Sequence, residues 1–370
     1  MKVKLEDVCE RGYSSIKQSD IIESTGDYPI FGAAGYIGNV DFYQQEKPYV
    51  AVVKDGAGIG RTTLHPAKSS VIGTMQYLLP KENVLPEYLY YVVRYMHLEK
   101  YFTGATIPHI YFKDYRNEQF NLDSLDVQKR IVNILGKCEK IISDRQSELA
   151  KLDDLIKARF VEMFGDPYLN EFSWQKVKIK NAVTVEPQNG MYKPQSDYVT
   201  DGSGIPILRI DGFYDGVVTD FSSLKRLKCS ENERQKYLLY EDDVVINRVN
   251  SIEYLGKCAH INGLLEDTVY ESNMMRMHFD PMRFHPVYVC HLLCSRYIYD
   301  QIVNHAKQAV NQASINQKDV LDFEIYEPPI ELQEQFAAFV EQADKSKAAV
   351  QKSLDETQVL FDSLMQKYFG

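Results

Sequence analysis

The feature that most constrains this chain is a proline-free segment of helical pattern, Asp126 to Phe164, which contains a single glycine. A shift of 205 residues places this segment without a gap on a second one, Glu331 to Phe369. A glycine follows each segment, and Pro167 prevents continuation of the first. At roughly 1.5 Å per residue, each segment should form a helix about 58 Å long. The sequence therefore predicts the same long helix twice.

Both segments carry apolar side chains alternately four and three residues apart, which is the seam of a coiled coil. Two amphipathic helices in one globular core would be the alternative, but such helices are usually several times shorter and have a wider apolar stripe. Three cations interrupt the seam, and we expect their stems to pack while their charges reach water, although they could also fix the register. These cations are Arg145, Arg159 and Lys347. The predicted helix interface consists of Ile131, Leu135, Ile142, Leu149, Leu152 and Ile156 in the first helix, and of Phe336, Val340, Val350, Leu354, Phe361 and Leu364 in the second.

A compact domain between the two helices must return the chain close to where it left, so the helices should run antiparallel. The sequence thus predicts an α/β (α+β) fold, with two globular domains separated by two long antiparallel coiled-coil helices and related by an internal pseudo-two-fold duplication. The predicted boundaries are residues 1–123 for the first domain, 124–165 for the central helix, 166–328 for the second domain and 329–370 for the C-terminal helix.

The two globular parts also follow one order. A strand pattern at Val244 matches the one at Val50, and a proline, Pro86 or Pro286, opens a helix in each part. Leu255-Gly256-Lys257 stands where Ile59-Gly60-Arg61 stands in the first part, and Lys318-Asp319 repeats Lys113-Asp114. Nearly every other side chain differs. The pattern indicates two readers of different surface on a spacer of fixed geometry.

The composition is less informative than this pattern. A length of 370 residues suggests two to three domains, and 44% hydrophobic residues suffice for ordinary cores. Since no apolar run approaches the roughly 20 residues of a membrane span, and the N-terminus lacks the apolar segment of a signal peptide, we expect a cytoplasmic protein. A net charge of −10 neither indicates nor excludes nucleic acid, because phosphate contact needs only a local basic surface.

Six irregularly placed cysteines are typical of reduced thiols rather than a disulfide framework. The pair Cys290 and Cys294, with His291 between them, has a spacing that could suit a metal. Because no second pair at metal-ligand spacing lies nearby in the sequence, we expect cysteines of a helical core and predict no metal site.

A strand pattern at Tyr49 to Val53 leads into the glycine-rich stretch Lys54 to Thr63. A strand that is followed by D-G-A-G-I-G could form the cofactor loop of a methyltransferase. In such a loop, the glycines let a cofactor approach a helix N-terminus. The residues that follow, RTTLHPAKSS, have no helical period. The glycines are therefore expected to serve a tight β-turn. Further on, the sequence predicts a helix from Pro86 that ends at Gly104.

At this point the chain resembles a known family, the specificity subunits of type I restriction-modification enzymes. The resemblance covers essentially the whole chain and rests on the order domain, long helix, domain, long helix. It is carried by YPIFGAAGYIG (residues 28–38), PYVAVVKDGAGIGRT (48–62) and DDVVINRVNSIEYLGK (242–257), together with Gln128 and Gln333 at the openings of the helices.

The resemblance implies two target-recognition domains, each of which reads one half of a bipartite sequence in double-stranded DNA. It implies that the paired helices set the gap and dock two modification (methyltransferase) subunits, and that restriction (translocase and nuclease) subunits join them. S-adenosylmethionine, ATP and magnesium are then expected in the partner subunits, with no cofactor in this chain. The compact first domain implies that base-contacting loops of larger relatives are shortened.

The residues agree with a non-catalytic subunit. No N-P-P-Y or D-P-P-Y tetrapeptide for methylation of an exocyclic amine is present, and the nearest, Glu327-Pro-Pro-Ile, lacks the aromatic residue. No G-x-x-x-x-G-K-[ST] phosphate loop is present either. We therefore predict no catalytic residue.

Candidates for DNA contact follow from residue type and loop placement, because arginine and lysine suit guanine edges and phosphates while asparagine and glutamine suit adenine. In the first domain they are Lys54, Arg61, Thr62, His65, His109, Tyr111 and Lys113, and in the second Arg209, Asn247, Arg248, Asn250, Lys257, Gln308, Asn311 and Gln312. Each could equally be a solvated surface residue. Two other functions stay open: a coiled-coil scaffold with protein- or sugar-binding domains and no DNA role, and a self-contained methyltransferase that uses the D-G-A-G-I-G loop.

Overall fold

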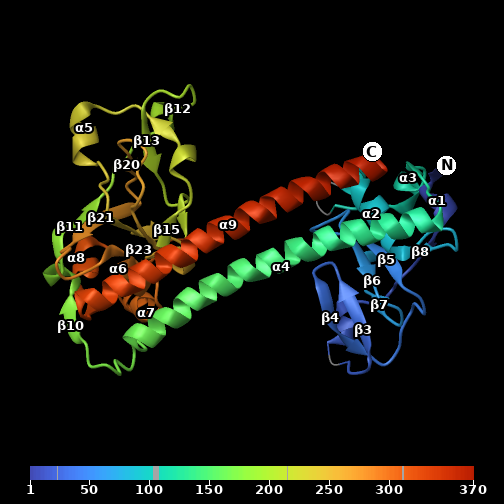
Figure 1. The fold of residues 1–370 in the computed structure, drawn as a ribbon, viewed down its shortest axis with the longest axis horizontal. Helices are drawn as coiled ribbons and strands as arrows, with labels where there is room; N and C mark the ends of the chain where they lie inside the picture. The colour runs from blue at the N-terminus through green and yellow to red at the C-terminus, as the bar shows by residue number, and fades with distance from the viewer. Residues whose placement is uncertain (23, 103–107, 215, 311) are drawn as a thin grey trace. The chain divides into compact units, whose positions relative to one another are not determined.

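A computed structural model describes residues 1–22, 24–102, 108–214, 216–310 and 312–370 (Figure 1). The chain divides into two compact units. Unit 1 combines Met1–Leu149 with Ala349–Gly370, and unit 2 consists of Ala150–Ala348. Two helices, α4 (Leu125–Phe164) and α9 (Ile330–Phe369), each pass from one unit into the other. The sequence analysis treats each long helix as a segment of its own, whereas the two compact units each contain part of both helices.

Unit 1 contains two small sheets and a strand pair. In the order of hydrogen bonding, the four-stranded sheet is β2 (Cys9–Gly12), β8 (Met75–Pro80), β5 (Tyr49–Val53) and β6 (Thr62–His65). The three-stranded sheet is β4 (Gly35–Val40), β3 (Tyr28–Gly32) and β7 (Ser70–Val71), and the pair is β1 (Lys2–Lys4) with β9 (Gln119–Asn121). The short helices are α1 (Leu5–Val8), α2 (Pro86–Tyr95), α3 (Phe112–Tyr115), η1 (Gln18–Ile21) and η2 (Leu98–Tyr101).

Strand β5 is buried on both faces, which explains its unbroken run of apolar residues. Successive side chains of a strand point to opposite faces. Val50 and Val52 join the core that holds α2 and the long helices, whereas Tyr49, Ala51 and Val53 join a second cluster with β7 and β8. The glycine-rich stretch leads into strand β6 and not into a helix, as the sequence predicts.

Unit 2 contains larger sheets. A six-stranded sheet runs β11 (Val183–Asn189), β21 (Met274–Phe279), β17 (Val244–Asn247), β19 (Cys258–His260), β15 (Gly216–Val218) and β14 (Phe213–Tyr214). A four-stranded sheet runs β12 (Tyr198–Val199), β16 (Arg226–Leu227), β13 (Ile205–Leu208) and β20 (Val269–Tyr270), and a three-stranded one β18 (Val249–Asn250), β23 (Ala313–Ser314) and β22 (Lys307–Gln308). Strand β10 (Gln175–Lys178) pairs with β24 (Glu324–Glu327).

The helices of unit 2 are α5 (Glu231–Lys236), α6 (Pro286–Leu293), α7 (Arg296–His305) and α8 (Gln317–Asp322), with 3-10 turns η3 (Ile179–Asn181), η4 (Gln195–Asp197), η5 (Phe221–Ser223) and η6 (Ile252–Tyr254). Strand β17, like β5, has apolar side chains in a separate core on each of its faces. Val244 and Ile246 of β17 join the core that holds α6, α7 and the long helices, and Val245 joins a separate cluster on the other face.

The long helices run antiparallel in both units, as predicted. In unit 1 the early part of α4, with Ile131 and Leu135, shares a core with Phe361 near the end of α9. In unit 2 the late part of α4, with Ile156, shares a core with Phe336 near the start of α9. All twelve predicted seam residues are buried or half-buried.

The cations of the seam are paired. The Lys347 ammonium lies 2.8 Å from the Asp153 carboxylate of the other helix. The side chain of Lys347 is half-buried. The guanidinium of Arg159 lies 5.7 Å from the centre of the Phe339 ring. Both helices thus exchange charged contacts as well as apolar ones.

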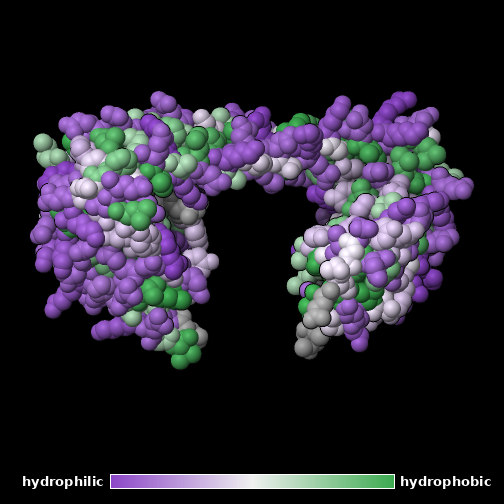
Figure 2. Space-filling model, turned by 90° about the horizontal axis from the view of Figure 1, so that it is seen from below, coloured by the Kyte–Doolittle hydropathy of each residue, from purple (hydrophilic) through white to green (hydrophobic). Residues whose placement is uncertain are grey.

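The sequence-predicted helix from Pro86 to Gly104 was wrong at its end. Helix α2 ends at Tyr95, and His97 takes a left-handed backbone with φ of 50°, which a continuing helix does not allow. The chain resumes as η2, and Gly104 lies outside the described residues. Among the described residues, no helix has the length and apolar character needed to cross a bilayer. Figure 2 shows mostly hydrophilic residues on the face in view, with scattered apolar ones.

Candidate nucleic-acid interface

In unit 1, a tight corner follows strand β5. The amide of Val53 donates to the carbonyl of Arg61 at 2.9 Å, and the amide of Gly60 donates back to the carbonyl of Val53 at 2.9 Å. Gly56, Gly58 and Gly60 have positive φ of 82° to 86° (86°, 83° and 82°), a conformation that glycine adopts without steric cost. We call residues 53–61 corner 1.

A second segment, residues 108–113, is fastened to corner 1. The amide of Ile110 donates to the carbonyl of Lys54 at 3.0 Å, and Nδ1 of His109 lies 2.6 Å from Oδ1 of Asp55. The rings of His109 and Tyr111 stack at 6.4 Å, and the Lys113 ammonium lies 5.2 Å from the centre of the Tyr111 ring. Five of the predicted residues are therefore brought together although some fifty positions separate them in sequence: Lys54, Arg61, His109, Tyr111 and Lys113.

The cations of corner 1 are held by their surroundings. The Lys54 ammonium lies 3.7 Å from the Asp55 carboxylate and 5.5 Å from the centre of the Tyr13 ring. Arg61 is exposed, and its Nη1 donates to the carbonyl of Ala33 at 3.1 Å. Tyr13, with 71% of its surface exposed, was missed in the sequence because nothing local links it to Lys54.

Unit 2 repeats the same hydrogen bonds with different side chains. The amide of Asn247 donates to the carbonyl of Lys257 at 2.8 Å, and the amide of Gly256 donates to the carbonyl of Asn247 at 3.0 Å. The amide of Ile315 donates to the carbonyl of Arg248 at 3.0 Å, as that of Ile110 does to Lys54. Arg248 thus stands at the position of Lys54, and Lys257 at that of Arg61. We call residues 247–257 corner 2.

The side chains of corner 2 also lie against aromatic rings and carbonyls. The Lys257 ammonium donates to the carbonyl of Ile210 at 2.6 Å and lies 3.8 Å from the centre of the Tyr214 ring. Nη1 of Arg248 donates to the carbonyl of Ser272 at 3.1 Å. The aromatic partner Tyr214, which is 50% exposed, is another residue that the sequence did not indicate.

A short hairpin extends corner 2. Strand β23 pairs with β18 on one side and with β22 on the other, so that Asn250 and Gln308 both lie opposite Ala313. Gln308 and Gln312 are exposed, and at the tip Val310 is 98% exposed. The candidate Asn311 lies outside the described residues. Lys307, exposed on β22, adds a cation that the sequence reading did not include.

Three of the residues predicted to lie on loops are instead buried within strands. Thr62 and His65 lie within strand β6, where they are 9% and 5% exposed, and Asn247 lies within β17 with no exposed surface. Burial lowers the pKa of His65 to about 4, so this ring is neutral and belongs to the core. Strand β6 begins directly after corner 1, and Asn247 ends the strand that precedes corner 2.

Arg209 is engaged within its own domain. Its Nη1 donates to the Tyr198 hydroxyl at 3.0 Å and lies 3.7 Å from the Glu271 carboxylate, while its Nε lies 3.6 Å from Asp211. Two carboxylates thus offset its charge, which makes it a weaker candidate for phosphate contact than the cations of the corners.

Comparison with known proteins shows what parts of this chain are similar to. Residues 1–152 match the family model described as the type I restriction modification DNA specificity domain. The first part of this chain is therefore similar to the type I DNA specificity domain. The matched segment includes all of corner 1 and the fastening segment of residues 108–113.

Individual proteins are similar to about half of this chain. A stretch of 200 residues is 28% identical to a protein of Methanocaldococcus jannaschii that is provisionally named the MjaX specificity subunit of a type I restriction enzyme; it covers 53% of this chain and 45% of the relative. Another of 202 residues is 27% identical to the EcoKI specificity subunit of Escherichia coli and covers 53% of this chain and 42% of the relative. The matched part thus spans less than half the length of these relatives.

Solved structures of specificity subunits share the fold. The S subunit of a type I restriction-modification system from M. genitalium covers 100% of this chain, and 96% of that chain is matched, with a TM-score of 0.63 at 14% identity. A chain from a study of complex assembly and conformational transition of the type I system has a TM-score of 0.56 at 16% identity. The chain is therefore similar in fold to these solved structures.

Proposed function

We propose that this chain is the DNA sequence-specificity subunit of a type I restriction-modification enzyme, in which each unit reads one half of a bipartite target. The observation that carries the proposal is the repeated corner. Two units that differ in sheets, loops and most side chains keep the same backbone hydrogen bonds and place a cation at the same two positions, Lys54 and Arg61 in one unit and Arg248 and Lys257 in the other.

Cations at such corners suit the chemistry of a duplex. Lysine and arginine contact phosphates and the acceptor atoms of guanine in the major groove, and neighbouring glutamine and asparagine suit adenine. Because affinity for DNA arises from local neutralisation of phosphates, a net charge of −10 over the chain does not oppose it. The scaffold hypothesis gives no reason for two equivalent cation pairs.

The long helices offer a surface for the modification subunits. On α4, Ile134, Ile141 and Leu155 are 39%, 44% and 50% exposed although they are large and apolar. They are spaced by multiples of seven residues and therefore lie on one face of the helix, away from the buried seam. An exposed apolar row on a helix favours association with a partner.

Catalysis in this proposal belongs to the partners. The chain carries neither a methyltransferase tetrapeptide nor a phosphate loop, so the modification subunits would supply S-adenosylmethionine and transfer the methyl group. Restriction subunits would supply the ATP- and magnesium-dependent steps.

The test uses the full chain with its modification subunits and maps methylated sites across a plasmid library. Arg61→Gln should relax one half of the motif, and Lys257→Gln the other, at a cost of roughly 1–3 kcal/mol for each lost contact. The salt dependence of DNA binding should fall by about one ion for each lost phosphate contact. Lys129→Gln, an exposed cation at the start of α4, is the matched control.

Two results would contradict the proposal. One is methyl transfer by the chain without modification subunits, because the chain would then be the enzyme. The other is methylation that is unchanged in both halves by Arg61→Gln and Lys257→Gln, because the corners would then have no part in recognition.

A further inference from the structure

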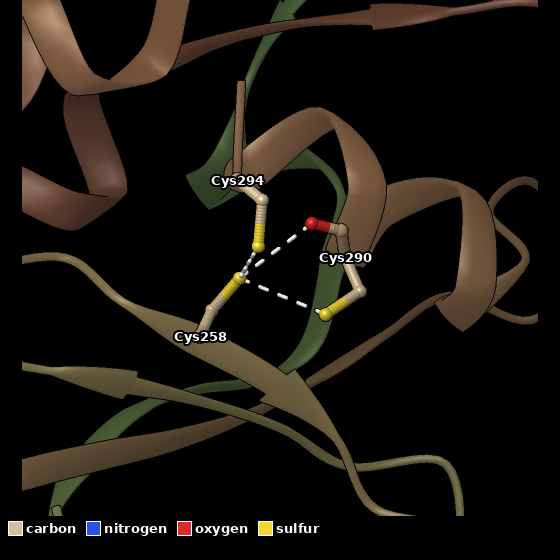
Figure 3. A group of neighbouring side chains, drawn as sticks. All are labelled: Cys258, Cys290 and Cys294. Atoms are coloured by element: carbon tan, nitrogen blue, oxygen red, sulfur yellow. Dashed lines mark hydrogen bonds between the residues drawn. The ribbon is translucent and has the colours of Figure 1, made fainter. Parts of the chain in front are cut away.

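Unit 2 gathers three cysteines that are distant in sequence. Cys258 lies on strand β19, Cys290 on helix α6, and Cys294 directly after this helix (Figure 3). Their sulfur atoms point toward one another and all lie within 4.8 Å. Within the described residues, no other group of three cysteine, histidine or acidic side chains comes together in this way.

The sulfur atoms have nearly the separation that a bound ion requires. Sγ of Cys258 lies 3.6 Å from Sγ of Cys290 and 3.2 Å from Sγ of Cys294. A tetrahedral zinc ion with Zn–S bonds of about 2.3 Å separates its sulfur ligands by about 3.8 Å. The two separations from Cys258 are thus slightly shorter than this value, and the third pair of sulfur atoms lies within 4.8 Å.

A glycine lies close to the sulfur atoms. Gly216 has φ of 86°, and a Cβ added there would lie 3.3 Å from Sγ of Cys290 and 4.0 Å from Sγ of Cys294. Any other residue at this position would thus crowd the cluster. Cys258 and Cys290 are 0% and 2% exposed, whereas Cys294 is an exposed residue and provides a route from solvent.

We propose that Cys258, Cys290 and Cys294 bind a thiophilic d10 cation, Zn²⁺, through three thiolates, with a water molecule or another small ligand in the fourth position. Thiolates select soft ions of this class over magnesium or calcium. Binding forms three metal–sulfur bonds and releases three thiol protons to solvent, with no change of oxidation state. The ion joins strand β19 to the end of α6, and so it braces the strand that begins next to Lys257 of corner 2.

The expected binding can be measured on the reduced, full-length chain after removal of metal by a chelator. We expect one equivalent of Zn²⁺ in competition with a chromophoric chelator, and a thiolate-to-metal charge-transfer band with Cd²⁺ as a second probe. Cys294→Ser removes the exposed ligand and should weaken Zn²⁺ binding by more than roughly 100-fold, since even partners outside the ligand shell change affinity by up to that factor. Cys229→Ser, which leaves all three ligands in place, is the matched control.

The binding should also stabilise unit 2. Because the ion binds the folded chain, Zn²⁺ should raise the thermal midpoint of the wild type and of Cys229→Ser but not of Cys294→Ser. The proposal is overturned if the wild type binds no Zn²⁺ stoichiometrically and gives no Cd²⁺ band, or if Cys294→Ser binds as tightly as Cys229→Ser. If Cys294→Ser does not fold, the wild-type Cd²⁺ band decides alone, and its absence overturns the proposal.

Discussion

In each unit, a buried glutamine joins the globular part to the start of a long helix. Its replacement tests how much this contact stabilises the unit. Gln128, in the first turn of α4, has no exposed surface. Its Oε1 accepts from the amide of Leu85 at 2.9 Å, and its Nε2 donates to the carbonyls of Asn83 at 3.0 Å and Asp123 at 2.9 Å. The amide thus fixes the start of α2 to the start of α4.

Unit 2 repeats this contact. Oε1 of Gln333 accepts from the amide of His285 at 2.8 Å, and its Nε2 donates to the carbonyls of Arg283 at 2.9 Å and Pro328 at 2.8 Å. Gln333 has no exposed surface either. Each glutamine can therefore be replaced separately, and each replacement serves as the control for the other unit.

The expected cost follows from the three bonds. Gln128→Leu removes them with little change in volume, at about 1 kcal/mol each, and leaves the amide of Leu85 without its partner. The loss should be roughly 3–5 kcal/mol for unit 1. For a domain of this size such a loss lowers the melting temperature by about 10 °C. It also raises the opening constant for hydrogen exchange by about two to three powers of ten.

Hydrogen exchange with mass spectrometry separates the two units by peptide. Gln128→Leu should accelerate exchange in β5 and α2, and Gln333→Leu in β17 and α6. Gln146→Leu, an exposed position of α4, should change neither. The reasoning is refuted if Gln128→Leu behaves like Gln146→Leu, or if it accelerates both units equally.

Three further predictions can be tested on the same protein. First, burial lowers the pKa of His65 from 6.5 to about 4. Between these two pH values the unfolded chain takes up a proton that the folded chain does not. The free energy of unfolding should therefore be constant above pH 6.5 and fall by up to about 3 kcal/mol toward pH 4. Acid titration of unfolding should lose this slope in His65→Gln, and an unchanged slope would contradict it. Second, Leu149→Asp or Leu354→Asp should cost roughly 1–3 kcal/mol at the half-buried seam and weaken assembly with modification subunits, whereas Lys151→Asp on the exposed face should not. Third, a heptad inserted after Asp144, with another after Ala349, should lengthen both helices by about 10.5 Å. The unread gap in the methylated motif should then grow by about three base pairs. Methylation that keeps the original gap would show that the helices do not set its length.

The long helices could be predicted from sequence because their signal is local. A proline-free run with apolar residues every three or four positions requires no knowledge of what lies elsewhere in the chain. Pro86 and Pro286 likewise mark the first turns of α2 and α6 through their own backbone geometry. Even so, the end of α2 was misplaced, because the left-handed turn at His97 depends on packing rather than on a breaker residue.

The sites depend on contacts that no local pattern carries. Cys258 reaches Cys290 and Cys294 only after the six-stranded sheet has formed against α6, so the spacing of the cysteines suggested a simple core. Asp55 meets His109 because segments more than fifty residues apart pair at corner 1. His65 was predicted to lie on a loop, but it ends strand β6, whose pairing with β5 is a contact between separate segments of the chain.

The repeated corners explain how two domains keep one plan while their sequences diverge. The bonds they share are donated and accepted by the backbone: Val53 with Arg61, and Asn247 with Lys257. Such bonds make no demand on side-chain identity beyond a glycine before the last position, Gly60 or Gly256, whose φ is 82° or 77°. Under the proposed function, side chains at the corners are therefore free to change with the recognised bases, whereas Gln128 and Gln333 are held by the hydrogen bonds of their own side chains. A chain that reads two half-sites needs this division, because specificity has to vary while the frame that presents it does not.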